Sequence, residues 1–225
     1  MRRFPMTNAF LLRRATVSIG LIASALVLNA LSGCARSAAP SSDQFAAALK
    51  DYLAQRGDLC LAKTDWPIDL TQHEIDTGAR NALQLPVLER LGLASSTVAE
   101  VDVKDDQEMP HRMKVRRYAL TEAGRQFYLT RERATPGGGR QTVGDFCAAR
   151  LSLDRVVHWE LAGEGGDRLA TVSYTYQVKA APWTADAEVQ RVFPVVAQVI
   201  RGAGSAQLQE RFRPTATGWV AVDLP

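Results

Sequence analysis

The first regular pattern of apolar positions in the chain has helical spacing. Ser41-Ser42-Asp43-Gln44 has the form of a capping box, and after it apolar residues recur at Phe45, Ala48, Leu49, Tyr52 and Leu53. Gly57 ends this pattern. A second helical pattern covers 76–91, where Pro86 is expected to kink the helix or start a new one and Gly92 to end it. The mixed stretch between them, 58–70, predicts strand and loop.

The middle of the chain predicts a hairpin followed by a short helix. Strands are expected over 98–103 and 112–120, joined by the acidic turn KDDQEMP. Thr121 can cap a helix over 122–129. The segment RERATPGGGRQT, residues 131–142, has the composition of a Gly-rich loop or linker.

After Cys147 the pattern changes to alternation with a period of two, which is typical of strands. Two strands are expected within 151–161 and 170–178, then a helix over 183–200 bent at Pro194, then strands over 207–213 and 219–224. This order, β-β-α-β-β, predicts an antiparallel sheet with one covering helix. The fold class expected for the whole chain is α+β, with N-terminal helices and a hairpin in 41–130 followed by this sheet in 143–225, the two parts packed together as one unit.

The first residues predict export. MRRFPMTNAFLLRRATVS carries four arginines and no acid, and the uncharged run Ile19–Ala30 follows it. A membrane-spanning helix is the alternative, but it needs about 20 apolar residues. The next four residues, Leu31-Ser32-Gly33-Cys34, resemble the lipobox of bacterial lipoproteins. The resemblance implies removal of 1–33 and lipid on Cys34, with 34–40 as a flexible tether. Ala35 is not the aspartate that retains enteric lipoproteins in the inner membrane, which by analogy implies the outer membrane, on its periplasmic face.

Removal of the leader changes the charge of the protein. The whole chain carries a net charge of +3, but four arginines leave with the leader and the remaining net charge is −1. The global charge therefore gives no reason to expect a polyanionic partner.

The cysteine count fits an exported protein. If Cys34 carries lipid, Cys60 and Cys147 remain, and an even number suggests one disulfide that closes a loop of about 88 residues. Two separate buried thiols are the alternative. A metal site is not expected, because neither cysteine has a C-x-x-C partner and His73, His111 and His158 are scattered.

Residues 79–128 resemble the winged-helix domains of bacterial repressors. The likeness rests on the sequence pattern L-x-x-L-G-L followed by Y-x-L-T-x-x-G-R, and on the order helix, hairpin, helix. In that family the hairpin is a wing whose basic residues meet DNA phosphates. Here Arg112, Lys114, Arg116 and Arg117 make a basic strand, but the turn is acidic and an exported protein meets no chromosome. No nucleic-acid partner is expected.

Motifs of the common enzyme classes are missing from the sequence. There is no G-x-S-x-G, H-E-x-x-H or G-x-G-x-x-G motif, and the pairs His73-Glu74 and His158 with Glu160 lack a third member. Trp159, Tyr174 and Tyr176 could form the floor of a ligand groove, although core packing is the more ordinary role.

The sequence thus favours a lipid-anchored envelope protein without catalysis or cofactor. Its partner would be the membrane, through Cys34, and an envelope protein, glycan or small molecule. An exported hydrolase of unrecognised type is the alternative, and a winged-helix regulator is the remote one.

Overall fold

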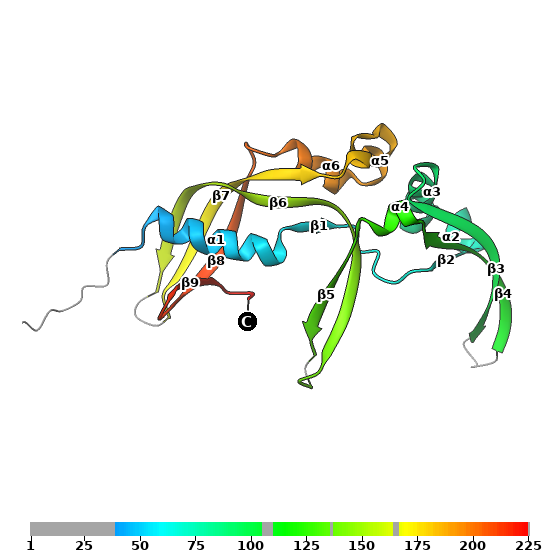
Figure 1. Ribbon diagram of the computed structural model, residues 1–225, viewed down its shortest axis with the longest axis horizontal. Coiled ribbons are helices and arrows are strands. Elements are labelled where there is room, and N and C mark those ends of the chain that lie inside the picture. The colour runs from blue at the N-terminus through cyan, green and yellow to red at the C-terminus, as the bar shows by residue number, and fades with distance from the viewer. Residues whose placement is uncertain (1–38, 105–109, 136, 164–166, 225) are drawn as a thin grey trace, which may run out of the picture. The chain divides into compact units, whose positions relative to one another are not determined.

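The computed structural model describes residues 39–104, 110–135, 137–163 and 167–224 (Figure 1). The chain from Ala39 onward forms one compact unit. The expected leader, the lipobox with Cys34 and most of the tether lie outside the described residues.

Helix α1, Ser42–Arg56, begins where the sequence predicts. The side chain of Ser41 accepts a hydrogen bond from the backbone N–H of Gln44 at 3.3 Å, and the Ser41 N–H donates to the Gln44 side chain at 3.0 Å. This reciprocal pair confirms the capping box. Phe45 and Leu49 are completely buried, so the apolar stripe of the helix is its packing face.

A six-stranded antiparallel sheet forms the larger layer of the fold (Figure 1). Its strands run in the order β1-β6-β7-β8-β9, and β5 pairs with the N-terminal part of β6. The bounds are β1 Asp58–Cys60, β5 Tyr128–Ala134, β6 Arg140–Ala162, β7 Leu169–Ala180, β8 Gln207–Thr215 and β9 Gly218–Ala221. Because β6 is 23 residues long, it pairs with β5 along its first part and with β7 along its last part.

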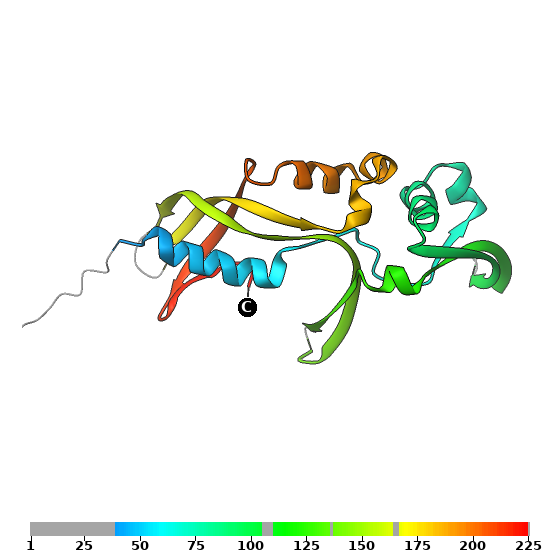
Figure 2. The same cartoon turned by 45° about the horizontal axis from the view of Figure 1, so that its top comes forward.

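A short 3-10 helix and two short α-helices connect β7 to β8. They are the 3-10 helix Pro182–Ala185, α5 Ala187–Val192 and α6 Pro194–Arg201. The side chain of Asp186 caps α5 by accepting hydrogen bonds from the N–H groups of Glu188 and Val189. Figure 2 shows α5 and α6, in orange, beside β7, in yellow. The helix expected over 183–200 is therefore broken, with Pro194 as the first residue of α6.

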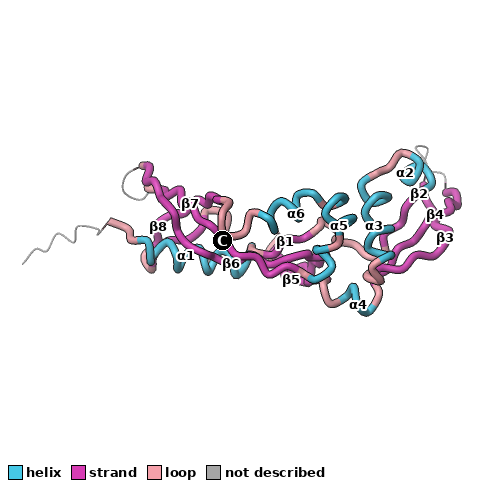
Figure 3. The backbone as a smooth tube through the Cα atoms, turned by 90° about the horizontal axis from the view of Figure 1, so that it is seen from above, coloured by secondary structure: helices cyan, strands magenta, loops and turns pink. Residues whose placement is uncertain are grey.

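A second, three-stranded sheet lies between β1 and β5 in the sequence (Figure 3). Its order is β2-β4-β3, with β2 Ile68–Thr71, β3 Ala94–Lys104 and β4 Pro110–Leu120. The helices α2, Gln72–Asp76, and α3, Arg80–Arg90, connect β2 to β3, and α4, Glu122–Arg125, follows β4.

The buried apolar side chains form two clusters. One joins α3 and the three-stranded sheet to the start of β6, the 3-10 helix and α5, and it includes Leu88, Tyr118, Phe146 and Trp183. The other lies under α1 and joins it to β7, β8 and β9, with Phe45, Tyr174 and Phe212. Both clusters contain residues from both halves of the chain, so the two halves share their cores.

The fold class predicted from the sequence is wrong. The protein is mostly β, with short helices distributed along an antiparallel framework, and it is not a helical part followed by a sheet. The N-terminal strand β1 joins the large sheet by pairing with β6, and α1 packs on this sheet. Pairing between strands that are distant in sequence decided this arrangement, and local periodicity does not report such pairing.

Three local predictions also differ from the structure. Most of the expected loop 131–142 is the β5–β6 ribbon, in which seven consecutive residues of β5 pair with β6. The helix expected over 122–129 ends at Arg125 because β5 begins at Tyr128. The helix expected over 76–91 is α3, which begins only at Arg80 because α2 ends at Asp76, and Pro86 lies inside α3 and does not start a new helix.

Candidate functional site

Of the aromatic residues proposed for a ligand groove, Tyr174 and Tyr176 lie in the core, and Trp159 is partly buried against it. Tyr174 and Tyr176 are 3% and 2% exposed, and the Tyr176 hydroxyl donates to the carbonyl of Val199 at 3.0 Å. The ring of Trp159 packs against Phe45 of α1 at a centroid distance of 5.4 Å. Because α1 covers this part of the sheet, no aromatic groove is formed at these residues.

A cleft of about 1090 Å³ lies on the described part of the chain. Its walls come from the C-terminal end of α1, from β1, from one face of the β5–β6 ribbon and from Leu224. Leu129, Arg131, Val143 and Asp145 occupy the ribbon side, and Cys60 and Cys147 are also in the lining. The cleft thus combines apolar side chains with charges of both signs.

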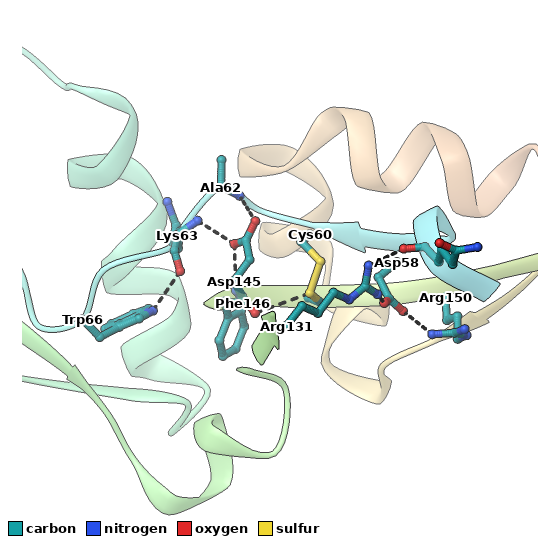
Figure 4. Close-up of a disulfide and its surroundings, with 11 residues drawn as sticks. Asp58, Cys60, Ala62, Lys63, Trp66, Arg131, Asp145, Phe146 and Arg150 are labelled. Atoms are coloured by element: carbon teal, nitrogen blue, oxygen red, sulfur yellow. Dashed lines mark hydrogen bonds and ion pairs between the residues drawn. A yellow bond between two sulfur atoms is a disulfide. The ribbon is translucent and has the colours of Figure 1, made fainter. Parts of the chain in front are cut away.

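A buried carboxylate, Asp58, lies at one end of the cleft between two arginines (Figure 4). The Asp58 side chain is 4% exposed and forms ion pairs with Arg131 and with Arg150, the latter at 3.0 Å. A carboxylate buried to this degree needs paired charges and hydrogen bonds to compensate for lost hydration. Its Oδ1 atom accepts a hydrogen bond from Arg150, and its Oδ2 atom forms the ion pair with Arg131 but accepts no hydrogen bond.

The same two guanidinium groups also bind carbonyl groups at the C-terminal end of α1. Arg131 donates to the carbonyl of Gln55, and Arg150 donates to the carbonyl of Ala54 at 2.8 Å. The last carbonyls of a helix have no partner within the helix, and positive charge is favourable at that end. Arg131 from β5 and Arg150 from β6 thereby connect the ribbon to α1 and β1.

A second carboxylate, Asp145, lies on the other side of the cysteine pair (Figure 4). Its oxygens accept the backbone N–H groups of Ala62 at 3.2 Å, Lys63 at 2.7 Å and Phe146 at 2.7 Å. Ala62 has a positive φ of 55°, which lets two successive N–H groups point at one anion. Asp145 therefore holds the turn after β1 against β6.

The side chain of Lys63 points away from this turn into the protein and is 2% exposed. Its ammonium group donates to the side-chain oxygens of Asn81 at 2.6 Å and Gln84 at 2.8 Å, and it lies 6.0 Å from the centre of the Phe193 ring. Burial, with a contribution from Arg80, lowers the pKa of Lys63 to about 8, although Asp145 opposes this shift. Lys63 joins the turn after β1 to α3.

Cys60 and Cys147 face each other across the β1–β6 pairing. Their sulfur atoms are 1.96 Å apart, which is compatible with a disulfide bond. The geometry supports the pairing expected from the cysteine count, and the sulfurs lie in the wall of the cleft between Asp58 and Asp145 (Figure 4).

The segment that resembles a winged helix uses one side of α3 for internal packing. Gln84 donates to the carbonyl of Val192 at 2.8 Å, and Arg90 pairs with Asp186 at 2.7 Å. The hydrogen bond from Arg90 lowers the pKa of Asp186. On the hairpin, Arg117 forms two hydrogen bonds with Asp69 at 2.7 Å each, so this basic residue of the strand is already paired.

The histidines do not gather at the cleft. His158 lies 3.6 Å from Glu160, and both side chains are well exposed, while Glu74 caps the first turn of α2 and His73 is exposed. The side chain of His111 is outside the described structure. In the described chain, no group of three or more side chains is arranged to hold a metal ion, and no helix is long and apolar enough to cross a membrane.

The sequence did not indicate the residues that define the cleft. Asp58, Lys63, Arg131, Asp145 and Arg150 belong to no motif, and they meet because β1, β5 and β6 pair. Of the residues singled out beforehand, the cleft contains only Cys60 and Cys147. Comparisons with family models, with curated proteins and with solved structures find no significant match to the chain.

Proposed function

We propose that this chain is an exported lipoprotein, lipidated at Cys34 and held at the periplasmic face of the outer membrane, whose body binds a partner without catalysis. The observation that carries the proposal is the arrangement of the other two cysteines. Once Cys34 is assigned to lipid, Cys60 and Cys147 remain, and their sulfurs are at disulfide distance. A disulfide in the body suits an oxidising compartment outside the cytosol.

The anchoring is tested by labelling growing cells with palmitate and measuring the mass of the mature protein. We expect label in the wild type, an N-terminus at Cys34 and no label in Cys34→Ser. The Cys34→Ser variant retains Cys60 and Cys147, so it also controls for lipid attached elsewhere. An unlabelled wild-type protein that keeps Met1 would rule out the anchor.

We further propose that the cleft beside Cys60 and Cys147 is the binding site and that it takes a polar ligand: a segment of an envelope protein, a glycan or a small molecule. Arginines line one side and the carboxylate of Asp145 lies on the other, so a ligand with hydrogen-bonding or charged groups is complementary to it. The volume of about 1090 Å³ is sufficient for a small molecule or several residues of a peptide.

The state of the two carboxylates favours binding over hydrolysis. A general base must be able to accept a proton from its substrate or from water. Asp58 is held by two guanidinium groups, and Asp145 accepts three backbone N–H groups, so both are fully engaged by the fold. A nucleic-acid role is likewise not favoured, because α3 is engaged with α5 through Gln84 and Arg90.

The cleft is tested by placing a photo-crosslinking amino acid at Leu129, which lies in the cleft and is 38% exposed. The matched control is the same amino acid at Val195, which is 66% exposed on α6 and is not in the cleft lining. In intact envelopes, we expect an adduct from Leu129 and none of the same mass from Val195. Identical adducts at both positions, or none at Leu129, would refute the cleft as the binding site.

A further inference from the structure

The outer edge of β3 is long and regular, without the short length or the bulges that protect other sheet edges. Exposed strand edges tend to pair with other chains, and proteins avoid this with short, bulged or charged edge strands. In the described chain, β1, β2 and β9 have three or four residues, and the pairing of β6 with β7 shifts register twice. The edge strand β5 has seven residues and carries consecutive charges at Arg131 and Glu132. By contrast, β3 has eleven residues and pairs with β4 without any register shift.

The direction of the backbone groups on this edge follows from Ser96. The N–H of Ser96 donates a hydrogen bond to the side chain of Glu89 at 2.8 Å, so this N–H points away from β4. In an extended strand the N–H and C=O groups of alternate residues point to the same side. The groups of Val98, Glu100 and Asp102 hence point outward from the sheet, and no described strand pairs with them.

The side chains on this open stretch define what could pair with it. Val98 is 74% exposed, and Glu100 and Asp102 follow it on the same face of the strand. Arg112 lies 3.8 Å from Glu100 and 3.5 Å from Asp102, and all three side chains are more than half exposed, so these ion pairs contribute little. The nearest neighbours of an added strand would thus be one apolar and two acidic side chains.

The two acidic side chains favour an added strand with cationic side chains, and the basic residues of the hairpin do not change this preference. Arg112, Lys114 and Arg116 belong to β4, which lies one strand further in. An added strand would be about 10 Å from β4, because neighbouring strands are about 4.8 Å apart. Exposed charges at such a separation are largely screened at physiological salt.

We propose that β3 is a docking edge, to which an extended segment of a partner protein with cationic side chains at alternate positions adds as the fourth strand of the sheet β2-β4-β3. The added strand exchanges backbone hydrogen bonds with Val98, Glu100 and Asp102, and its cations face the two carboxylates. This docking edge is formed by residues 89–120 alone, independently of lipidation and of the cleft.

A second copy of this chain fits the edge less well than such a partner. If the open stretch 98–102 paired with itself in antiparallel fashion, Glu100 would lie directly opposite Glu100 of the other copy. Like charges directly opposite each other destabilise a strand pair.

The probe for the test is a fluorescent nine-residue peptide in which lysine and valine alternate. Methyl groups on alternate backbone nitrogens leave it one edge for pairing and prevent the peptide from aggregating. The control peptide has glutamate in place of lysine. Binding is measured by fluorescence anisotropy, and amide hydrogen exchange at Val98, Glu100 and Asp102 reports the site.

The protein variants separate backbone pairing from side-chain contact. Val98→Pro removes an outward N–H at an exposed position, and Val98→Thr retains that N–H. We expect wild type and Val98→Thr to bind the lysine peptide within about twofold of each other, and Val98→Pro to bind at least tenfold more weakly. The double variant Glu100→Gln with Asp102→Asn leaves the backbone unchanged and should lose the preference for the lysine peptide over the glutamate peptide.

Three results would overturn the proposal. The first is equal binding by Val98→Pro and Val98→Thr when both show the thermal unfolding transition of the wild type. The second is no saturable binding of the lysine peptide together with no added protection of the three amides. The third is a dimer in sedimentation that Val98→Pro dissociates, because the edge would then belong to a second copy.

Discussion

The carboxylate of Asp145 holds the backbone of Lys63, with 2.7 Å between its Oδ1 atom and the Lys63 nitrogen. The same carboxylate accepts the N–H of Ala62, so one side chain on β6 fixes the turn that follows β1. Lys63 lies three residues after Cys60, and Asp145 lies two residues before Cys147. Together they determine how the cleft is joined to α3.

Removing this carboxylate should destabilise the protein. Asp145→Ala leaves the N–H groups of Ala62 and Lys63 without their acceptor, and an unsatisfied buried donor costs on the order of 2 kcal/mol. Urea unfolding measures the change in the free energy of unfolding. Asp65→Ala is the control, because exposed Asp65 accepts only the Thr64 hydroxyl, and it should change stability by less than about 0.5 kcal/mol. Equal losses in the two variants would contradict the role given to Asp145.

Ala62→Gly should have the opposite effect. Ala62 has a φ of 55°, a conformation that costs an alanine about 1–2 kcal/mol and a glycine very little. After allowing for the greater freedom of glycine in the unfolded chain, we expect a gain of about 0.5–1 kcal/mol in the free energy of unfolding. Ala47→Gly, at an exposed position inside α1, should lose about 1 kcal/mol. If Ala62→Gly loses as much as Ala47→Gly, the turn does not have this conformation in solution.

The cysteine pair should contribute a large part of the stability. A bond between Cys60 and Cys147 spans 87 residues in sequence, for which the chain-entropy model gives roughly 4 to 5 kcal/mol. Reductant should lower the urea midpoint of the wild type and leave Cys60→Ser with Cys147→Ser unaffected. Alkylation without reductant should label neither cysteine, and labelling of both would show that the bond is not formed.

Lys63 should make stability depend on pH in the alkaline range. Its folded pKa of about 8 lies below its ordinary value of 10.5, so between these values the unfolded chain binds more protons. The free energy of unfolding must therefore rise with pH in this window, by about 2 kcal/mol between pH 7 and 9.5. Burial raises the pKa of Tyr174 to about 12, which acts in the opposite direction only above pH 10.

Variants identify the group responsible for this dependence. Lys63→Met removes the titrating amine and should flatten the rise between pH 7 and 9.5. Lys50→Met replaces an exposed lysine of α1 and should retain it. A rise of equal size in both variants would assign it to another group.

The elements with local signals were predicted well. The capping box at Ser41 gives the start of α1, and the alternation after Cys147 gives β7 and β8 close to their observed positions, the second half of β6, and part of β9. These signals depend on residues within a few positions of one another, and such information is present in one sequence.

The features that depend on pairing between distant strands could not be predicted in the same way. The glycines of 137–139 suggested a linker, yet they lie at the turn of a ribbon whose strands are fixed by pairing with each other. The alternating spacing of Trp159 and Tyr174 fits both a strand that packs in the core and a strand that forms the floor of a ligand groove. The sequence does not show that α1 packs over them, and this packing distinguishes the two roles. Asp58, Arg131 and Arg150 come together from three strands and leave no local pattern.

The length of helix α1 also limits how far the cleft can lie from a membrane to which Cys34 is anchored. Six residues lie between Cys34 and Ser41, so the seven steps from one Cα to the next reach at most about 25 Å when stretched out, while a helix of 15 residues adds about 22 Å. With Cys34 as the proposed anchor, the cleft at the far end of α1 can work no further than roughly 45–50 Å from the bilayer surface. A ligand further than this from the bilayer would have to be brought within this distance before the anchored protein could bind it.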